Sequence, residues 1–161
     1  MTAKNSTAKG APHNERSAAR LKATQALYQL EMTRGDTEEV IQEFIDHRFG
    51  PDSETGAGCI PDEAFFQDLL RGVVLNQAQI DQALAASLAS GWTLARIDSI
   101  LRALLRAAAY ELIGRADVPV KVVIDEYVEL TKDFFDGEEP SFVNAVLDRL
   151  ARNKRGELIG S

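Results

Sequence analysis

The sequence predicts an all-α protein, organised as a single-domain bundle of about seven helices. Hydrophobic residues recur with a period near 3.6 in every long segment, which is the spacing of one face of an α-helix. Glycine and proline fall between these segments, where they end one helix or begin the next. The 161 residues are 45% hydrophobic, which is enough to bury the core of one domain. We therefore expect a helical domain over residues 15–155, with a disordered basic arm before it (1–14) and a disordered tail after it (156–161).

Residues 16–31, RSAARLKATQALYQLE, are predicted to form the first helix, with cations on one side. Its expected core stripe follows the i, i+3, i+4, i+7 pattern and consists of Ala23, Ala26, Leu27 and Leu30. Arg16 and Arg20 lie one turn apart, and Lys22 adds a third positive charge. We expect these three side chains to face solvent and to contact an anionic ligand. The alternative is that they only solvate the helix.

Three more helices are predicted before residue 90. Gly35 is the expected stop of the first helix, and Asp36 is the expected N-cap of the second, over residues 37–49, with Glu39 completing a capping-box-like pattern. Residues 50–61, GPDSETGAGCIP, are typical of a mobile loop. Beyond the loop, the hydrophobic spacing predicts two helices, and Asn76 is expected to end the first and to cap the second.

The fifth helix is predicted at the centre of the fold, because residues 97–108 keep hydrophobic helical spacing without interruption. On its other face, Asp98, Arg102 and Arg106 follow one another at four-residue steps. This spacing predicts a ladder of charges along the surface of the helix.

Two prolines mark the starts of the last two helices. Pro119 precedes a predicted sixth helix over residues 120–134, and Pro140 suits the first turn of a seventh that ends in basic residues near Arg152. The sixth helix is rich in β-branched residues, so its prediction depends on the helical period more than on propensity.

The chain is acidic overall, with a formal net charge of −7, but its first part is basic. Residues 1–34 contain six Lys or Arg against two Glu, a net charge of +4, so the remaining residues carry −11. The six cations are Lys4, Lys9, Arg16, Arg20, Lys22 and Arg34. An acidic chain is not expected to coat duplex DNA, because such binding needs many phosphate contacts. The asymmetry predicts a local contact with a polyanion, at the N-terminal end.

No motif of catalysis or metal binding stands out. Cys59 is the one cysteine, which excludes a disulfide within this chain, and His13 and His47 are too few to complete a closed zinc site. The sequence has no GxxxxGK[ST], HExxH, GxSxG or CxxC pattern. It also lacks a run of the ~20 apolar residues needed to span a bilayer, or the apolar core of a secretory signal. We therefore predict a cytoplasmic protein without enzymatic activity, cofactor, metal or membrane contact.

Four motifs together resemble the NusB family of transcription antitermination factors. In the family's order they are ARxxATQALYQ, ILRALLRAAAYEL, DVPVKVVIDEYVELTKDF and SFVNAVLDR, and the resemblance extends from about Arg16 to Arg152. It implies a small helical domain that pairs with the ribosomal protein NusE and binds single-stranded boxA-type RNA of ribosomal RNA transcripts. Through this complex the protein would help the transcribing RNA polymerase to remain processive.

The resemblance also implies roles for individual residues. Contacts with RNA phosphates are implied for Arg16, Arg20 and Lys22, supplemented by Lys4 and Lys9 of the arm. Phe142 is similar to a position on the family's RNA surface, where a ring can stack on an unpaired base. The alternative for Phe142 is a core position in the seventh helix.

NusE is expected to contact Tyr28 and the exposed side of the fifth helix near Arg102. Other functions stay open: an accessory domain that acts with an RNA methyltransferase, or a structural helical adaptor whose N-terminal charge is incidental. A homodimer of the free protein, formed through the same surface, is also open.

Overall fold

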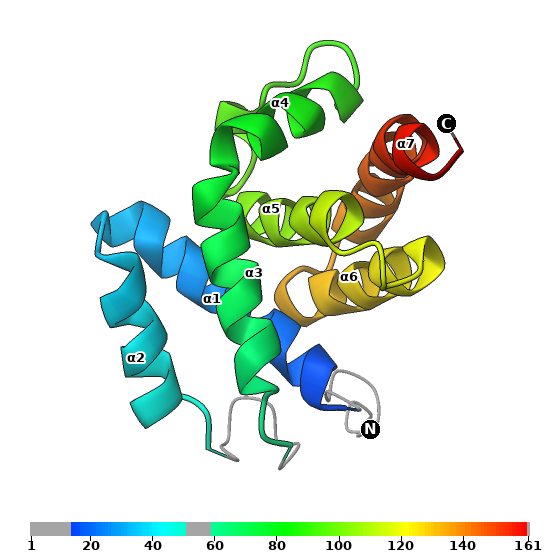
Figure 1. The fold of residues 1–161 in the computed structure, drawn as a ribbon. Helices are drawn as coiled ribbons and strands as arrows, with labels where there is room; N and C mark the ends of the chain where they lie inside the picture. The colour runs from blue at the N-terminus through cyan, green and yellow to red at the C-terminus, as the bar shows by residue number, and fades with distance from the viewer. Residues whose placement is uncertain (1–13, 51–58, 161) are drawn as a thin grey trace. The chain divides into compact units, whose positions relative to one another are not determined.

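The computed structural model of the chain describes residues 14–50 and 59–160 and confirms the all-α architecture (Figure 1). Over these residues it contains seven α-helices, one 3₁₀ helix and no strand. By its contacts the chain divides into two compact units, residues 1–71 and 72–161. The predicted arm, with Lys4 and Lys9, lies outside the described residues except for Asn14, and so do residues 51–58 of the predicted loop.

The first unit is built from α1 (Glu15–Thr33), α2 (Thr37–His47) and most of α3 (Glu63–Leu75). Asp36 caps α2 as predicted, because its Oδ2 accepts a hydrogen bond from the Glu39 N–H at 3.0 Å. The predicted stop of α1 at Gly35 is wrong by one residue. Arg34 takes the left-handed conformation, with φ of 55°, and its N–H donates to the Leu30 carbonyl at 2.8 Å.

Phenylalanines join α2 to α3 in the core of the first unit. The rings of Phe44 and Phe66 stack with centroids 5.8 Å apart, and Phe49 meets Phe66 edge-on at 4.9 Å. Phe49 lies just beyond α2, which ends at His47 and not at residue 49 as predicted. On the surface, Arg71 donates two hydrogen bonds, of 2.7 and 2.8 Å, to Glu38. These bonds hold the pKa of Glu38 below its usual value.

The second unit contains the remaining helices, and α5 lies at its centre as predicted (Figure 1). Its elements are α4 (Gln77–Ser87), η1 (Leu94–Arg96), α5 (Ser99–Gly114), α6 (Val120–Phe134) and α7 (Glu139–Gly160). The helix α5 packs against α4, α6 and α7, and apart from Glu111 its fully buried residues are small or aliphatic. The small or aliphatic residues without exposed surface are Leu104, Leu105, Ala107, Ala108, Ala109 and Leu112.

The predicted charge ladder on α5 is wrong, because its three members contact different groups. Asp98 is the N-cap, and its Oδ1 accepts hydrogen bonds from the N–H groups of Ile100 and Leu101. Arg106 forms a bidentate pair with Asp81 of α4, with N–O distances of 2.8 and 3.0 Å. Arg102 is buried. The ladder fails because Asp98 is used to cap α5 itself, while Arg102 and Arg106 bind groups outside the helix.

Boundaries elsewhere agree closely with the sequence. Asn76 separates α3 from α4, and its Nδ2 donates to the Gly72 carbonyl at 2.8 Å, so it caps the end of α3. Its side chain makes no capping bond to α4. The sixth helix has the predicted bounds. The seventh extends to Gly160, so most of the segment predicted as a disordered tail is helical.

Candidate nucleic-acid interface

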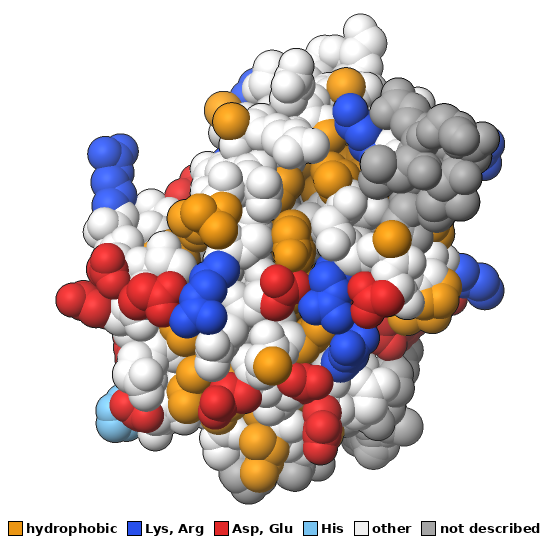
Figure 2. All heavy atoms as spheres, viewed as in Figure 1, with side chains coloured by type: hydrophobic (Ala, Val, Ile, Leu, Met, Phe, Trp, Pro, Cys, Tyr) orange, Lys and Arg blue, Asp and Glu red, His pale blue; other side chains and the backbone are white. Residues whose placement is uncertain are grey.

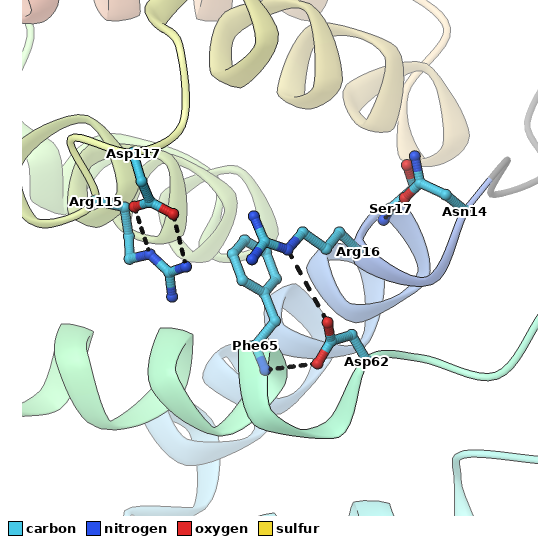
Figure 3. A network of polar contacts seen from close by, with 7 residues as sticks. All are labelled: Asn14, Arg16, Ser17, Asp62, Phe65, Arg115 and Asp117. Atoms are coloured by element: carbon cyan, nitrogen blue, oxygen red, sulfur yellow. Dashed lines mark hydrogen bonds and ion pairs between the residues drawn. The ribbon is translucent and has the colours of Figure 1, made fainter.

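The start of α1 lies against the start of α3, and this contact positions the N-terminal arginines (Figure 3). The backbone N–H of Asp62 donates to the Glu15 carbonyl at 3.0 Å. The Asp62 side chain caps the first turn of α3, because its Oδ1 accepts from the Phe65 N–H at 3.0 Å. At the start of α1, the Asn14 Oδ1 accepts from the Ser17 N–H at 2.7 Å. Both helix starts are therefore fixed by caps and by a backbone bond between them.

Phe65 forms a floor under two arginines. The Arg16 guanidinium lies 4.4 Å from the centre of the ring, and the Arg20 guanidinium lies 5.0 Å from it. Phe65 itself is 2% exposed, so its ring is available to these cations and not to a ligand. A guanidinium stacked on a ring keeps its N–H donors in its own plane, where they can still reach an anion.

Among the three cations predicted on the first helix, Arg16 is both exposed to solvent and held in position by neighbouring side chains. Its side chain is 43% exposed, and its Nε lies 4.0 Å from the Asp62 Oδ2, at the outer limit of an ion pair. Such an exposed pair is worth roughly 0–1 kcal/mol. A phosphate that forms hydrogen bonds at ~2.8 Å can displace so long a contact. The geometry therefore makes Arg16 a suitable phosphate ligand.

The expectation that Arg20 and Lys22 face solvent is wrong, since they are 4% and 2% exposed. Between residues 18 and 27, α1 is buried around nearly its whole circumference. Lys22 lies one turn from both Ala18 and Ala26, which are buried on the same face. The signal in the sequence was the set of small residues on all sides of this helix, since they allow close packing in every direction.

The other predicted contact residues fall in different environments. Tyr28, on α1, is 37% exposed, so it can meet a partner. Phe142 is partly exposed, and its ring lies 5.9 Å from that of Trp92, which is 51% exposed. Phe142 is therefore not a fully buried core position. Lys4 and Lys9 lie outside the described residues.

Arg102 is not at an exposed surface, and the prediction that it contacts a partner there is wrong. It is 8% exposed, and its Nη1 donates to three backbone carbonyls at distances between 2.6 and 3.5 Å. These carbonyls belong to Leu94, Ala95 and Ile97. Its role is to hold the η1 turn in place, which the spacing along one helix could not reveal.

Sequence reasoning missed Asp62, Phe65 and Trp92. The capping pattern of Asp62 before the third helix was visible in the sequence, but its proximity to Arg16 was not. Two residues 46 positions apart meet only because α1 and α3 pack together.

The face of the molecule drawn in Figure 2 is mixed in charge. On the face drawn in Figure 2, Lys and Arg side chains lie among Asp and Glu and do not form one continuous basic area. Within residues 14–50 and 59–160, no helix has both the length and the apolar character needed to cross a bilayer. The same described part of the chain has no group of three or more His, Cys, Asp or Glu placed to bind a metal ion.

The fold and this geometry define a small all-α protein whose first helix presents an exposed arginine stacked on an aromatic ring. Comparison with known proteins finds one family. The family model described as "NusB family" matches residues 17–152. The transcription antitermination protein NusB of Caulobacter vibrioides is 54% identical over 140 residues, covering 87% of this chain and 94% of that one. The NusB protein of Maricaulis maris is 50% identical over 140 residues, covering 87% and 88%.

A solved structure of T. maritima NusB has the same fold, with a TM-score of 0.72 and 32% sequence identity, over 86% of this chain and 91% of that one. The chain belongs to the NusB family of transcription antitermination proteins, which are not enzymes. The resemblance inferred from the four sequence motifs is thereby confirmed.

Proposed function

We propose that this protein, together with the ribosomal protein NusE, binds boxA-type RNA in ribosomal RNA transcripts and supports processive transcription by RNA polymerase. The observation that carries the proposal is the position of Arg16. Its guanidinium is half exposed, stacked on Phe65 and engaged in one long ion pair. It is therefore held ready for a phosphate at little cost in side-chain entropy.

Single-stranded RNA fits this surface better than a duplex does. The chain has a net charge of −7, and the exposed Arg16 lies beside the carboxylate of Asp62. A duplex is bound mainly through many phosphate contacts, whereas an unpaired strand also offers bases for stacking. The partly exposed Phe142 is a candidate for such stacking. The arm, with Lys4 and Lys9, would add further phosphate contacts.

NusE is proposed as the second RNA-binding component because this chain presents few exposed cations at its first helix. Burial of Arg20 and Lys22 leaves Arg16 as the exposed member of the three predicted there. A chain with so few phosphate contacts should bind RNA weakly alone. Tyr28, exposed on α1, is the proposed contact with NusE.

The test is a titration of boxA-like RNA and of a scrambled RNA of the same composition, each with and without NusE, at two salt concentrations. We expect preferential binding of the boxA-like RNA, and a preference that grows when NusE is present. Equal binding of both RNAs with NusE present would contradict the proposal. Absence of salt-dependent binding would instead support a structural adaptor.

A further inference from the structure

We propose that Trp92 and Phe142 form a two-ring platform on which an unpaired nucleobase stacks, with Arg149 beside it as a ligand for the adjoining phosphate. This inference rests on the proposed function, because it assigns a further contact to the same RNA. It adds Trp92, which lies outside the four sequence motifs, and Arg149, to which the sequence analysis assigned no role.

The three side chains come from two parts of the second unit. Trp92 lies in the turn between α4 and η1, and Phe142 lies in the first turns of α7. Their ring centroids are 5.9 Å apart, with the ring planes tilted by 52°. Arg149 follows Phe142 by two helical turns, so both side chains lie on the same face of α7. Proteins that bind single-stranded nucleic acids combine aromatic side chains, on which bases stack, with cations that contact the backbone.

Trp92 exposes 51% of its surface although it is the largest side chain in the protein. Among the large hydrophobic residues described as exposed in this unit, the others are aliphatic: Val74, Leu75 and Val122. The turn that carries the ring is well defined. Gly91 has φ of 92°, a conformation that favours glycine, and the Trp92 N–H donates to the Ala89 carbonyl at 3.1 Å.

Two arginines fix the loop that carries Trp92 at its two ends. Arg149 Nε donates to the Ser87 carbonyl at 2.7 Å, which ties α7 to the end of α4. Arg102 donates to the carbonyls of the η1 turn, on the other side of Trp92. A ring held in this way loses little freedom when a ligand stacks on it. A guanidinium has five N–H donors, so the bond to Ser87 leaves Arg149 with donors for a phosphate.

The residues around the ring favour a flat base over an apolar protein surface. The exposed neighbours of Trp92 in the chain are small or polar, namely Ala89, Ser90, Gly91, Thr93, Ala95 and Arg96. On α7, Phe142 is flanked by the exposed residues Ser141 and Asn144. A protein interface core is typically built from several contiguous apolar side chains. The open ring of Trp92, with the Phe142 ring tilted beside it and small polar groups and cations around both, matches a single base with its phosphate.

Trp92 is the only tryptophan of the chain, so its fluorescence tests the platform directly. A labelled single-stranded boxA-like RNA is titrated into the full-length protein, with and without NusE. Anisotropy of the RNA label reports binding, and tryptophan emission reports stacking. We expect emission to be quenched in proportion to the RNA bound. Parallel titrations of Trp92→Phe supply the emission of NusE itself.

Variants measure the contribution of each group. Trp92→Ala should weaken RNA binding by about 5- to 150-fold, the range for loss of one stacked base, whereas Trp92→Phe should retain most of the affinity. Arg149→Ala should lower the slope of log K against log salt by ~0.7, and Lys121→Ala, an exposed lysine on α6, should leave it unchanged. Thermal melting of each variant excludes a folding defect, and Trp92→Phe remains informative if Trp92→Ala unfolds.

The outcomes separate the platform from the proposed function. If RNA binds but emission stays constant and Trp92→Ala binds like the wild type, the platform is wrong and the proposed function stands. If NusE alone quenches Trp92 and RNA adds nothing, the rings are a protein-docking surface and the platform is equally wrong. If no RNA binds even with NusE, the proposed function itself fails.

Discussion

Arg16 is held at the protein surface by two weak contacts, and this weakness is what suits it to bind a ligand. Its stacking on Phe65 contributes roughly 0.5–1 kcal/mol at such an exposed position, and its long pair with Asp62 contributes roughly 0–1 kcal/mol. Neither contact is strong enough to prevent the guanidinium from turning its donors toward a phosphate. Arg20 differs because it is nearly fully buried beside the same ring.

We predict that Arg16→Ala weakens RNA binding and lowers the slope of log K against log salt by ~0.7, while the melting temperature changes little. Lys121→Ala is the matched control, since it removes an equal charge from an exposed position on α6. Arg20→Ala should instead lower the melting temperature, because it removes a buried side chain. RNA titrations at several salt concentrations and thermal melts check all three variants. An unchanged salt slope for Arg16→Ala would show that Arg16 does not contact phosphate.

At the scale of the element, α5 organises the second unit because small and aliphatic side chains cover most of its circumference. Alanine on several faces lets α4, α6 and α7 approach it closely. A polar side chain buried between α5 and α6 is paired with a hydrogen-bonding partner. Glu111 of α5 is fully buried, and its Oε2 accepts a hydrogen bond of 2.6 Å from the Tyr127 hydroxyl of α6.

We predict that Leu104→Ala destabilises the protein by about 2–5 kcal/mol, because it leaves a cavity in the core between α5 and the helices packed around it. Leu75→Ala is a matched control with the same chemical change, at a side chain that is 82% exposed, and it should be nearly neutral. Urea unfolding gives both free energies of unfolding. Similar values for the two variants would contradict the central position of α5.

Close packing also occurs near the end of α3, where the ring of Tyr110 of α5 lies against Gly72 and Gly114. A Cβ atom on Gly72 would lie 2.2 Å from the Tyr110 ring, and one on Gly114 would lie 2.7 Å from it. An alanine in a helix is favoured over glycine by about 1 kcal/mol, but overpacking costs about 1–3 kcal/mol. The contact between the new Cβ atom and the Tyr110 ring should therefore outweigh the gain in helix propensity and make each Gly→Ala substitution destabilising.

We predict that Gly72→Ala destabilises the wild type and becomes neutral or stabilising in a Tyr110→Ala background, where the ring is gone. A double-mutant cycle of unfolding free energies measures this coupling. Destabilisation of equal size in both backgrounds would mean that Tyr110 is not what restricts Gly72.

At the scale of the whole molecule, the proposed function couples the binding of RNA to the binding of NusE. If both ligands bind one complex cooperatively, RNA must tighten NusE binding by the same factor by which NusE tightens RNA binding. We predict that these two factors agree when each binary and ternary affinity is measured by titration. Tyr28→Asp should weaken NusE binding and reduce both factors together, with circular dichroism confirming that the variant is folded. Equal RNA affinity with and without NusE would contradict the shared complex.

The sequence identified most helices because hydrophobic periodicity is a local property. It placed the junction at Asn76, the cap at Asp36 and the bounds of α6, each of which depends on residues within a few positions. It failed where a neighbour from another element changed the outcome. Arg102 looked exposed from its spacing in α5, but the η1 turn folds over it. Leu30, expected in the core stripe of α1, is partly exposed.

For the candidate site, the sequence by itself determined the chemistry that is available: cations on the first helix, an aromatic residue at position 142 and an acidic remainder. Composition and short spacings set these features, so they do not depend on how the helices pack. Only the tertiary structure decided which of the groups reach solvent. It buried Arg20 and Lys22, placed Arg16 over Phe65 and brought Trp92 beside Phe142. Those contacts join residues dozens of positions apart, and burial is a property of the packed surroundings that one helix cannot specify alone.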